Sequence, residues 1–258
     1  MKTKILLLIT AAVLYGSTTI TAQTVESVSF SGGYSGTFSK RSDLQISSIN
    51  GAGGEVEVRF NAFRQFRVSI SGGYSVFSID QNIYAMFSEW NWRYWKRYFG
   101  DINDPNFSKS TQWVQSILKD SSYSAGFDPV QKMDAFPVFL TGSYEFSLTD
   151  NIALRPYLGA GVIFYSKRLY VEETWKKTFA ALDDYVYGYS YRNMAENVTG
   201  NPYAALGGFD AVYKMGDLIS LNLGAKYAYI FQTKGKFGYD NFPMKDMFSA
   251  RLGITFNY

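Results

Sequence analysis

The sequence of 258 residues contains no histidine and no cysteine. Histidine is the side chain that most readily takes up and releases a proton near neutral pH, so the Ser-His and Asp-His pairs of many hydrolases are excluded. The two absences also remove the commonest transition-metal ligands and every disulfide. We therefore expect no cofactor, no metal site and no enzyme activity, because any acid–base chemistry would depend on carboxylates or tyrosines alone.

Long apolar runs and blocks of one charge are missing as well. After the first 22 residues, no segment approaches the roughly 20 apolar residues of a membrane-spanning helix. The 25 Lys and Arg residues nearly balance the 22 Asp and Glu residues and form no basic block, so nothing indicates a nucleic-acid partner. Aromatic residues, in contrast, are abundant at 18% of the chain, and 21 of them are tyrosines.

The first 22 residues have the pattern of a secretory signal peptide. Lys2 and Lys4 precede an apolar run over residues 5–13, and a small polar stretch ends at Thr21-Ala22-Gln23. This is the order of a basic region, an apolar region and a cleavage site. We expect cleavage after Ala22 and a single exported domain over residues 23–258.

Apolar and polar residues alternate in eight segments of the remaining chain. In the segment from Phe248 to Tyr258, every second residue is apolar or aromatic, and the residues between are Ser, Arg, Gly, Thr and Asn. A strand needs this alternation when one face meets an apolar medium and the other a polar interior. Each segment has the ten or so residues that a tilted membrane-spanning strand requires. The predicted strands are residues 25–38, 52–62, 65–79, 136–148, 152–166, 202–213, 218–231 and 248–258.

The connections between these segments alternate in length. Those after the second, fourth and sixth strands have only a few residues, whereas the largest of the others span residues 80–135 and 167–200. Short turns on one rim and long loops on the other are typical of outer-membrane barrels. The sequence therefore predicts an all-β fold, an eight-stranded antiparallel transmembrane β-barrel with short periplasmic turns and long, partly helical outer loops. Its first partner is the lipid of the outer membrane.

One predicted hairpin also carries a resemblance. Residues 136–146, followed by the run Pro-Tyr-Leu-Gly-Ala-Gly at residues 156–161, resemble the central hairpin of the small outer-membrane β-barrel superfamily, which includes OmpW-type and OmpA-like barrels. The last strand, Phe248 to Tyr258, resembles the C-terminal signal that the barrel-insertion machinery reads. The resemblance implies that machinery as a partner, and its OmpW-type members imply limited passage of a small ligand.

Nine charged residues fall on the polar faces of the predicted strands and are expected to point into the barrel. Burying any one of them alone in a narrow interior is costly, so they must pair or be hydrated. One interpretation is a salt-bridged plug, because eight strands enclose only enough space for side chains. The other is a narrow polar conduit with charge selectivity. The nine are Glu55, Glu57, Arg59, Arg67, Glu145, Arg155, Asp210, Lys226 and Arg251.

The outer loops hold the densest aromatic clusters. Residues 83–99 contain three tryptophans and three tyrosines. Residues 109–119 and 172–191 place apolar side chains three or four positions apart, and this spacing predicts a helix in each. Such aromatics either form an interfacial belt with self-packed loop helices or bind a hydrophobic small molecule, a glycan or a partner protein. The candidate binding residues are Trp90, Trp92, Tyr94, Trp95, Trp113 and Trp175.

Two functions follow from these patterns. The first is an outer-membrane barrel that binds a small or amphipathic ligand through its aromatic outer loops, or allows its limited passage. The alternative is a non-conducting structural or interaction barrel, with a salt-bridged lumen and loops that bind a partner. The state of the lumen separates the two.

Overall fold

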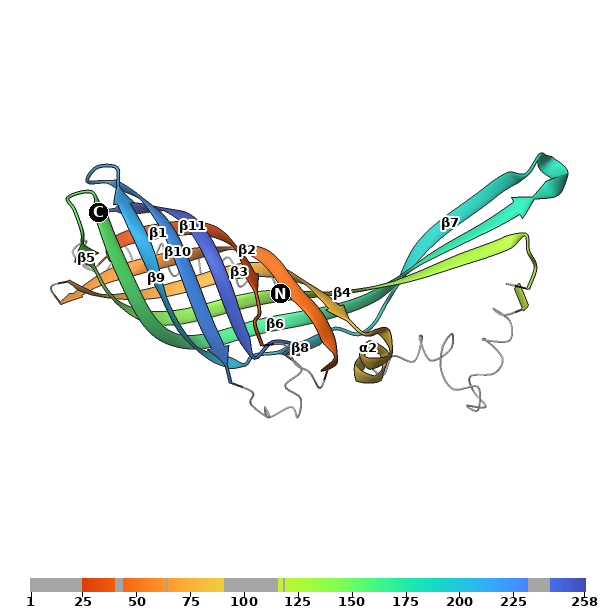
Figure 1. Cartoon of the computed structure of the whole chain (residues 1–258), viewed down its shortest axis with the longest axis horizontal. Helices are drawn as coiled ribbons and strands as arrows, with labels where there is room; N and C mark the ends of the chain where they lie inside the picture. Colours follow the sequence, from red (N-terminus) through yellow and green to blue (C-terminus); the bar gives the residue numbers. More distant parts are fainter. Residues whose placement is uncertain (1–24, 40–43, 64, 91–115, 118, 232–241) are drawn as a thin grey trace.

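The computed structural model describes residues 25–39, 44–63, 65–90, 116–117, 119–231 and 242–258. Eight of its strands pair in the order β1-β2-β3-β4-β6-β9-β10-β11, and β11 pairs with β1 to close the ring (Figure 1). All eight pairings are antiparallel, so the predicted barrel is confirmed. The predicted signal peptide lies outside the described residues. The strands are β1 (Val25–Gly36), β2 (Ile46–Phe63), β3 (Phe66–Gln81), β4 (Tyr123–Tyr144), β6 (Ile152–Phe179), β9 (Tyr203–Lys214), β10 (Ile219–Ile230) and β11 (Asp246–Asn257).

Smaller elements lie beside the ring. Strand β5 (Phe146–Ser147) pairs with the start of β6, and β7 (Tyr185–Met194) and β8 (Val198–Gly200) pair with its later part. Helix α2 (Ile83–Trp90) and the short 3-10 helix η2 (Ala180–Leu182) are the helices with both ends in the described part of the chain. No helix in the described part of the chain has the length and apolar character needed to cross a membrane.

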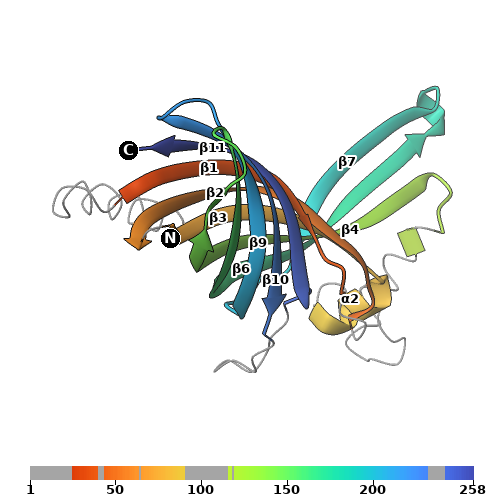
Figure 2. The same ribbon diagram turned by 60° about the vertical axis from the view of Figure 1, so that its left-hand side comes forward.

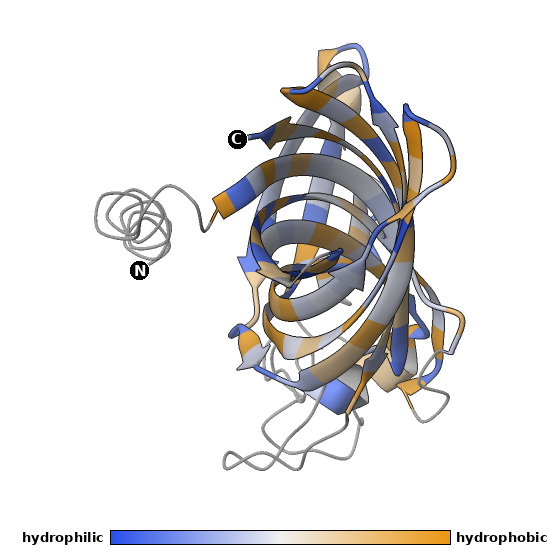
Figure 3. Cartoon of the chain, turned by 90° about the vertical axis from the view of Figure 1, so that its left-hand side faces the viewer, coloured by the Kyte–Doolittle hydropathy of each residue, from blue (hydrophilic) through white to orange (hydrophobic). Residues whose placement is uncertain are grey.

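Apolar and polar residues alternate along the strands of the ring (Figure 3), and the burial of their side chains places the apolar ones outward and the polar ones inward. Large outward side chains such as Phe30, Leu158 and Leu252 are 52 to 74% exposed, whereas inward residues such as Ser29 and Thr255 are buried. The exposed apolar residues recur on every strand of the ring. An apolar surface of this extent fits lipid rather than water.

The two rims of the barrel differ in the length of their connections. Two residues separate β2 from β3, four separate β5 from β6, and four separate β9 from β10. At the other rim, the chain between β3 and β4 runs over residues 82–122 and that between β10 and β11 over residues 231–245. An apolar exterior, a polar interior and this asymmetry define an outer-membrane barrel with its short turns in the periplasm. The protein therefore resides in the outer membrane.

Strands β4 and β6 run far past the outer rim and form an arm with β7 (Figures 1 and 2). The pairing of β3 with β4 ends at Ile79 and Gln131, but β4 and β6 stay paired out to Tyr123 and Lys177. Residues 170–179 of β6 then pair with all of β7. We call the sheet made by residues 123–130, residues 170–179 and β7 the arm.

The arm corrects the helix predicted over residues 172–191. That prediction relied on Trp175, Phe179, Leu182 and Val186, which recur at helical spacing. The same region alternates tyrosines with other residues from Tyr185 onward, and aromatic residues favour strands. The region fits both the helical spacing and the alternation of a strand, and pairing of β6 with β4 stabilises the strand. The helix predicted over residues 109–119 lies mostly outside the described residues.

Large side chains fill the outer half of the lumen because glycines oppose them. Gly161 of β6 lies across from Phe139 of β4, and a Cβ atom on Gly161 would come within 2.5 Å of the Phe139 ring. Glycine is therefore required for this close approach. The buried apolar cluster in this half includes Phe77, Met133, Phe139, Ile163 and Ile230.

We predict that Gly161→Ala destabilises the barrel by about 1–3 kcal/mol more than Gly72→Ala, since overpacking a filled interior costs that much. Gly72 is the matched control because a Cβ atom there meets nothing within 4 Å. Denaturant unfolding of both variants in lipid vesicles measures the difference. Equal stabilities would show that the lumen has room beside Phe139.

Candidate functional site

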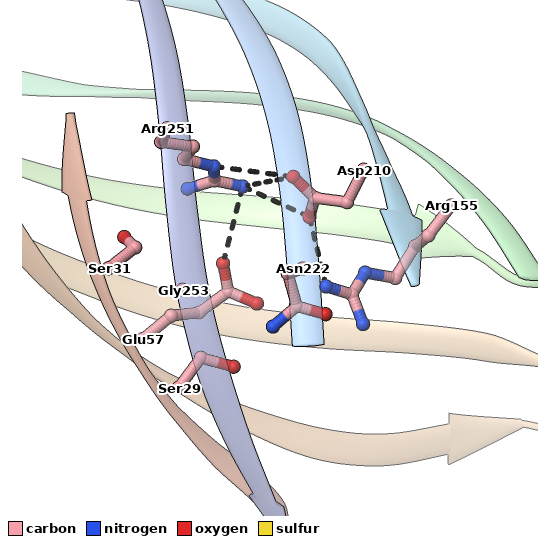
Figure 4. Close-up of a pocket in the computed structure, with 8 residues that line it drawn as sticks. All are labelled: Ser29, Ser31, Glu57, Arg155, Asp210, Asn222, Arg251 and Gly253. Carbon is pink, nitrogen blue, oxygen red and sulfur yellow. Dashed lines mark hydrogen bonds and ion pairs between the residues drawn. The ribbon is translucent and has the colours of Figure 1, made fainter. Parts of the chain in front are cut away.

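Seven of the nine predicted inward charges form one connected network at the centre of the lumen. Figure 4 shows the part of it made by Glu57, Arg155, Asp210 and Arg251. Arg251 of β11 joins its parts: one guanidinium nitrogen lies 2.6 Å from a carboxylate oxygen of Glu55, and another lies 3.0 Å from Asp210. The second nitrogen is also 3.9 Å from Glu57. A planar guanidinium has five donors, so Arg251 can bind several carboxylates at once.

The remaining members attach to these acids. Arg155 donates to Asp210 over 2.9 Å, and Arg59 pairs with Glu57 over 2.6 Å. Lys226 completes the network by pairing with Glu55. Arg155 and Asp210 are 3% and 2% exposed, so both charges have left water, and each depends on the other.

Strand register brings these charges to one level. Arg155 of β6 lies directly across from Asp210 of β9. Gly224 of β10 lies across from Asp210 on one side and Arg251 on the other. A Cβ atom on Gly224 would collide with Asp210 and approach Arg251 to 3.0 Å. The glycine therefore leaves the space through which these two side chains meet.

The other two predicted charges lie apart from this network, at the short-turn rim. Arg67 pairs with Glu26, and Glu145 pairs with Lys214 over 3.0 Å. Partial burial opposes ionisation of Glu145, but the hydrogen bond and charge of Lys214 outweigh it and hold the pKa of Glu145 below its ordinary value. Sequence reasoning missed both partners, because Glu26 and Lys214 stand at strand ends, where alternation gives little information.

The charge network leaves little free space around it. The cavity beside it measures about 10 Å³, about enough for one water molecule. Its lining comes from six strands and is polar except for one glycine. The lining residues are Ser29, Ser31, Glu57, Arg155, Asp210, Asn222, Arg251 and Gly253.

Helix α2 covers the lumen above the apolar cluster. Its Glu89 pairs with Lys167, an inward residue of β6 that is 1% exposed. The Trp90 indole donates a hydrogen bond of 2.5 Å to Gln131, and Gln131 donates one of 2.9 Å to Gln81. Three layers therefore fill the described lumen: paired charges, apolar side chains and the helix.

Two of the six predicted aromatic binding residues are described, and both are engaged within the protein. Trp90 contacts Gln131 and lies under the ammonium of Lys167. Trp175 is 6% exposed and donates its indole N–H to Glu173 over 2.9 Å. The remaining four, Trp92, Tyr94, Trp95 and Trp113, lie outside the described residues.

A row of exposed tyrosines on β7 was absent from the predicted candidates. Tyr185, Tyr187, Tyr189 and Tyr191 share one face of the arm and are 42 to 56% exposed. Neighbouring rings from Tyr187 to Tyr191 lie 6.2 Å apart, and the last two are stacked. Their alternation at every second position was the available signal, which the helical interpretation of this region concealed.

Among the residues that the structure describes, no group of three or more acidic side chains is placed to hold a metal ion. The charges of the site are instead paired with one another. The arrangement can stabilise and close the barrel, and it offers an aromatic surface outside it.

Comparison with known proteins finds similarity of structure only. No family model and no curated protein matches the sequence. Neisserial surface protein A is 11% identical, with a TM-score of 0.43, over 90% of this chain and 96% of its own. A major outer membrane protein from Thermus thermophilus is 13% identical, with a TM-score of 0.43, over 90% and 99%. The outer membrane protease OmpT from Escherichia coli is 9% identical, with a TM-score of 0.34, over 92% and 98%.

We predict that Arg251→Met lowers the free energy of unfolding by about 3–5 kcal/mol, because it leaves Glu55 and Asp210 buried with fewer partners. Arg192→Met is the control, since Arg192 and its partner Glu172 are 55% and 40% exposed and exposed pairs contribute at most about 1 kcal/mol. Denaturant unfolding in vesicles measures both. A similar loss in the two variants would show that the lumen network is hydrated.

Proposed function

We propose that this protein is a closed outer-membrane barrel that anchors the arm outside the cell as a binding surface. The observation that carries this proposal is the coexistence of a filled lumen with a long, exposed sheet beyond the outer rim. The barrel then supplies a rigid base, and the arm supplies the contact with a partner. This is the non-conducting alternative that the sequence predicts.

The filled lumen argues against passage of a ligand. Conduction needs a continuous path of water or polar ligands for the moving ion. Here the charges neutralise one another, and their shared cavity holds about one water molecule. The apolar cluster that includes Phe77 and Phe139 follows directly outward, and it offers an ion no compensation for lost hydration.

The arm supports the binding role. It is built from the continuation of two ring strands, so its base is fixed in the barrel wall. Within it, Glu173 accepts hydrogen bonds from Trp175, Asn193 and Tyr191, and Trp175 packs edge to face on Phe127. These contacts order one part of the face and anchor one end of the tyrosine row, whose residues remain 42 to 56% exposed. Rigid, amphipathic tyrosines are common in recognition surfaces.

This function requires no catalytic residue. Its partners would include the lipid of the outer membrane, which surrounds the barrel, and the barrel-insertion machinery, which would recognise the strand from Phe248 to Tyr258. Both remain predictions from the sequence.

We expect no discrete conductance from the refolded full-length protein in a planar bilayer, because three layers fill the described lumen. Glu55→Ala with Arg251→Ala is a matched variant that removes the ion pairs Arg251 makes with Glu55, Glu57 and Asp210 and the pair of Lys226 with Glu55, while leaving the apolar layer. It should also be silent, since the apolar layer remains. Protein recovered from the bilayer mixture must show the altered gel mobility of a folded barrel. Step-like currents from the folded wild-type protein would contradict the closed lumen.

A second test locates the arm. The chain has no cysteine, so Ser190→Cys on β7 gives a single thiol. We predict that a membrane-impermeant maleimide labels it on intact cells. Ser147→Cys, in β5 at the short-turn rim, should react only after the outer membrane is permeabilised. The opposite pattern would place the arm in the periplasm and defeat the proposal.

A further inference from the structure

Strand β7 forms an open edge of the arm. It pairs with β6 on one side, and no strand of the described chain pairs with its other side. Its ten residues include a single charge, Arg192, and no proline or lysine. Natural sheets usually protect a long edge with such residues, because unpaired backbone groups otherwise recruit another strand. An edge left open in this way is suited to strand pairing.

We propose that two copies of this protein pair through β7, edge to edge and antiparallel, about a two-fold axis beside Gly188. This inference rests on the proposed function, because it names the partner of the arm. The result is a six-stranded sheet shared by two molecules. Isologous pairing of this kind presents the same surface from both partners.

Charge complementarity selects this register. With Gly188 opposite Gly188, Arg192 of each copy lies opposite Asp184 of the other, so the same attraction forms twice. Asp184 directly precedes β7, in the turn that joins it to β6, with a φ of 57°, and it is exposed; its carboxylate would reach Arg192 from the end of the paired strands. Shifting one strand by two residues would place Arg192 opposite Leu182 or Val186. A shift by one residue would turn the tyrosines of the two copies to opposite faces.

The surroundings of Arg192 are compatible with this contact. Its guanidinium lies 3.2 Å from Glu172 of the neighbouring strand, and 55% of its side chain is exposed. In the paired sheet, Arg192 would lie between Glu172 of its own chain and Asp184 of the second copy. Opposite charges placed across neighbouring strands stabilise a sheet.

The tyrosine row fits strand pairing better than it fits stacking against a flat ligand such as a sugar ring. Tyr189 and Tyr191 are stacked with their planes 10° apart, so part of each ring face is already covered. In the proposed register, Tyr187 lies opposite Tyr189, and Tyr185 lies opposite Tyr191. Cross-strand aromatic pairs of this kind stabilise antiparallel sheets, and all the rings would lie on one continuous face.

The direction of the arm decides where the second copy lies. Strand β7 returns from the tip of the arm toward the barrel, and the arm leaves the outer rim obliquely (Figure 1). The two-fold axis reverses the strand, so the two barrels lie at opposite ends of the shared sheet. This arrangement joins two membranes that face each other, and the proposed partner is therefore the same protein on another cell.

The test uses the full-length protein in phosphatidylcholine vesicles, with outward arms verified by maleimide labelling of the Ser190→Cys chain. Wild-type vesicles should cluster, as measured by light scattering. Arg192→Asp and Asp184→Arg each place like charges opposite one another, and each should reduce clustering at least about tenfold. A mixture of the two variant vesicles should cluster again, because every pair between them is complementary. That rescue also shows that both variants are folded.

Ser124→Asp is the control, since Ser124 is exposed on the arm, lies on β4 and stands across from Lys176 rather than Glu172, and it should cluster as the wild type does. Clustering that persists in both single variants, or clustering with protein-free vesicles, would overturn self-pairing. The second result would identify lipid as the occupant of the tyrosine face. A third outcome separates the two proposals. If wild-type vesicles do not cluster, but the protein shows no conductance and Ser190→Cys is labelled on intact cells, self-pairing is wrong and the proposed function stands.

Discussion

A strand surrounded by lipid has no water to bond its backbone amides, so each must find a partner in another strand. In this protein, the pairing of β1 with β11 meets that requirement by closing the ring. Inside this junction, buried hydroxyl pairs join Ser29 to Thr255 and Ser35 to Ser249. The properties of the lumen follow from this closure, because eight strands enclose a space that side chains fill.

In so narrow a space, an inward side chain must either pair with a group of opposite charge or pack against apolar neighbours. Charges near the centre have lost water, and they are retained because they form one network around Arg251. Farther out, apolar side chains occupy the lumen, and glycines such as Gly161 give them room. Helix α2 then covers this layer through Glu89 and Lys167. A barrel filled in this way is stable and closed, and its binding surface has to lie outside it.

The need for closure ends at the outer rim, where water can satisfy backbone groups. Strands β4 and β6 continue past the rim without their ring neighbours, and β7 joins them as a third strand. The arm therefore has open edges, which the membrane-spanning part does not tolerate. The same backbone chemistry that closes the barrel within lipid makes the arm available for pairing in water. The proposed membrane-to-membrane contact uses that difference.

Much of this architecture could be predicted from the alternation of side chains. Eight strands and their inward and outward faces followed from the period of two, because each strand needs apolar residues on its lipid side and polar residues on its lumen side. Alternation gives the direction of a side chain but no partner, so the convergence on Arg251 and the separate rim pairs of Arg67 and Glu145 depended on strand register. The arm was misread because Trp175 and Phe179 fit a helical spacing as well as a strand, and only pairing with β4 resolved the ambiguity. The barrel and its two faces can therefore be predicted from alternation alone, because they are local properties of each strand. The closed lumen and the open edge of β7 depend on the folded chain, because both arise from contacts between residues far apart in the sequence.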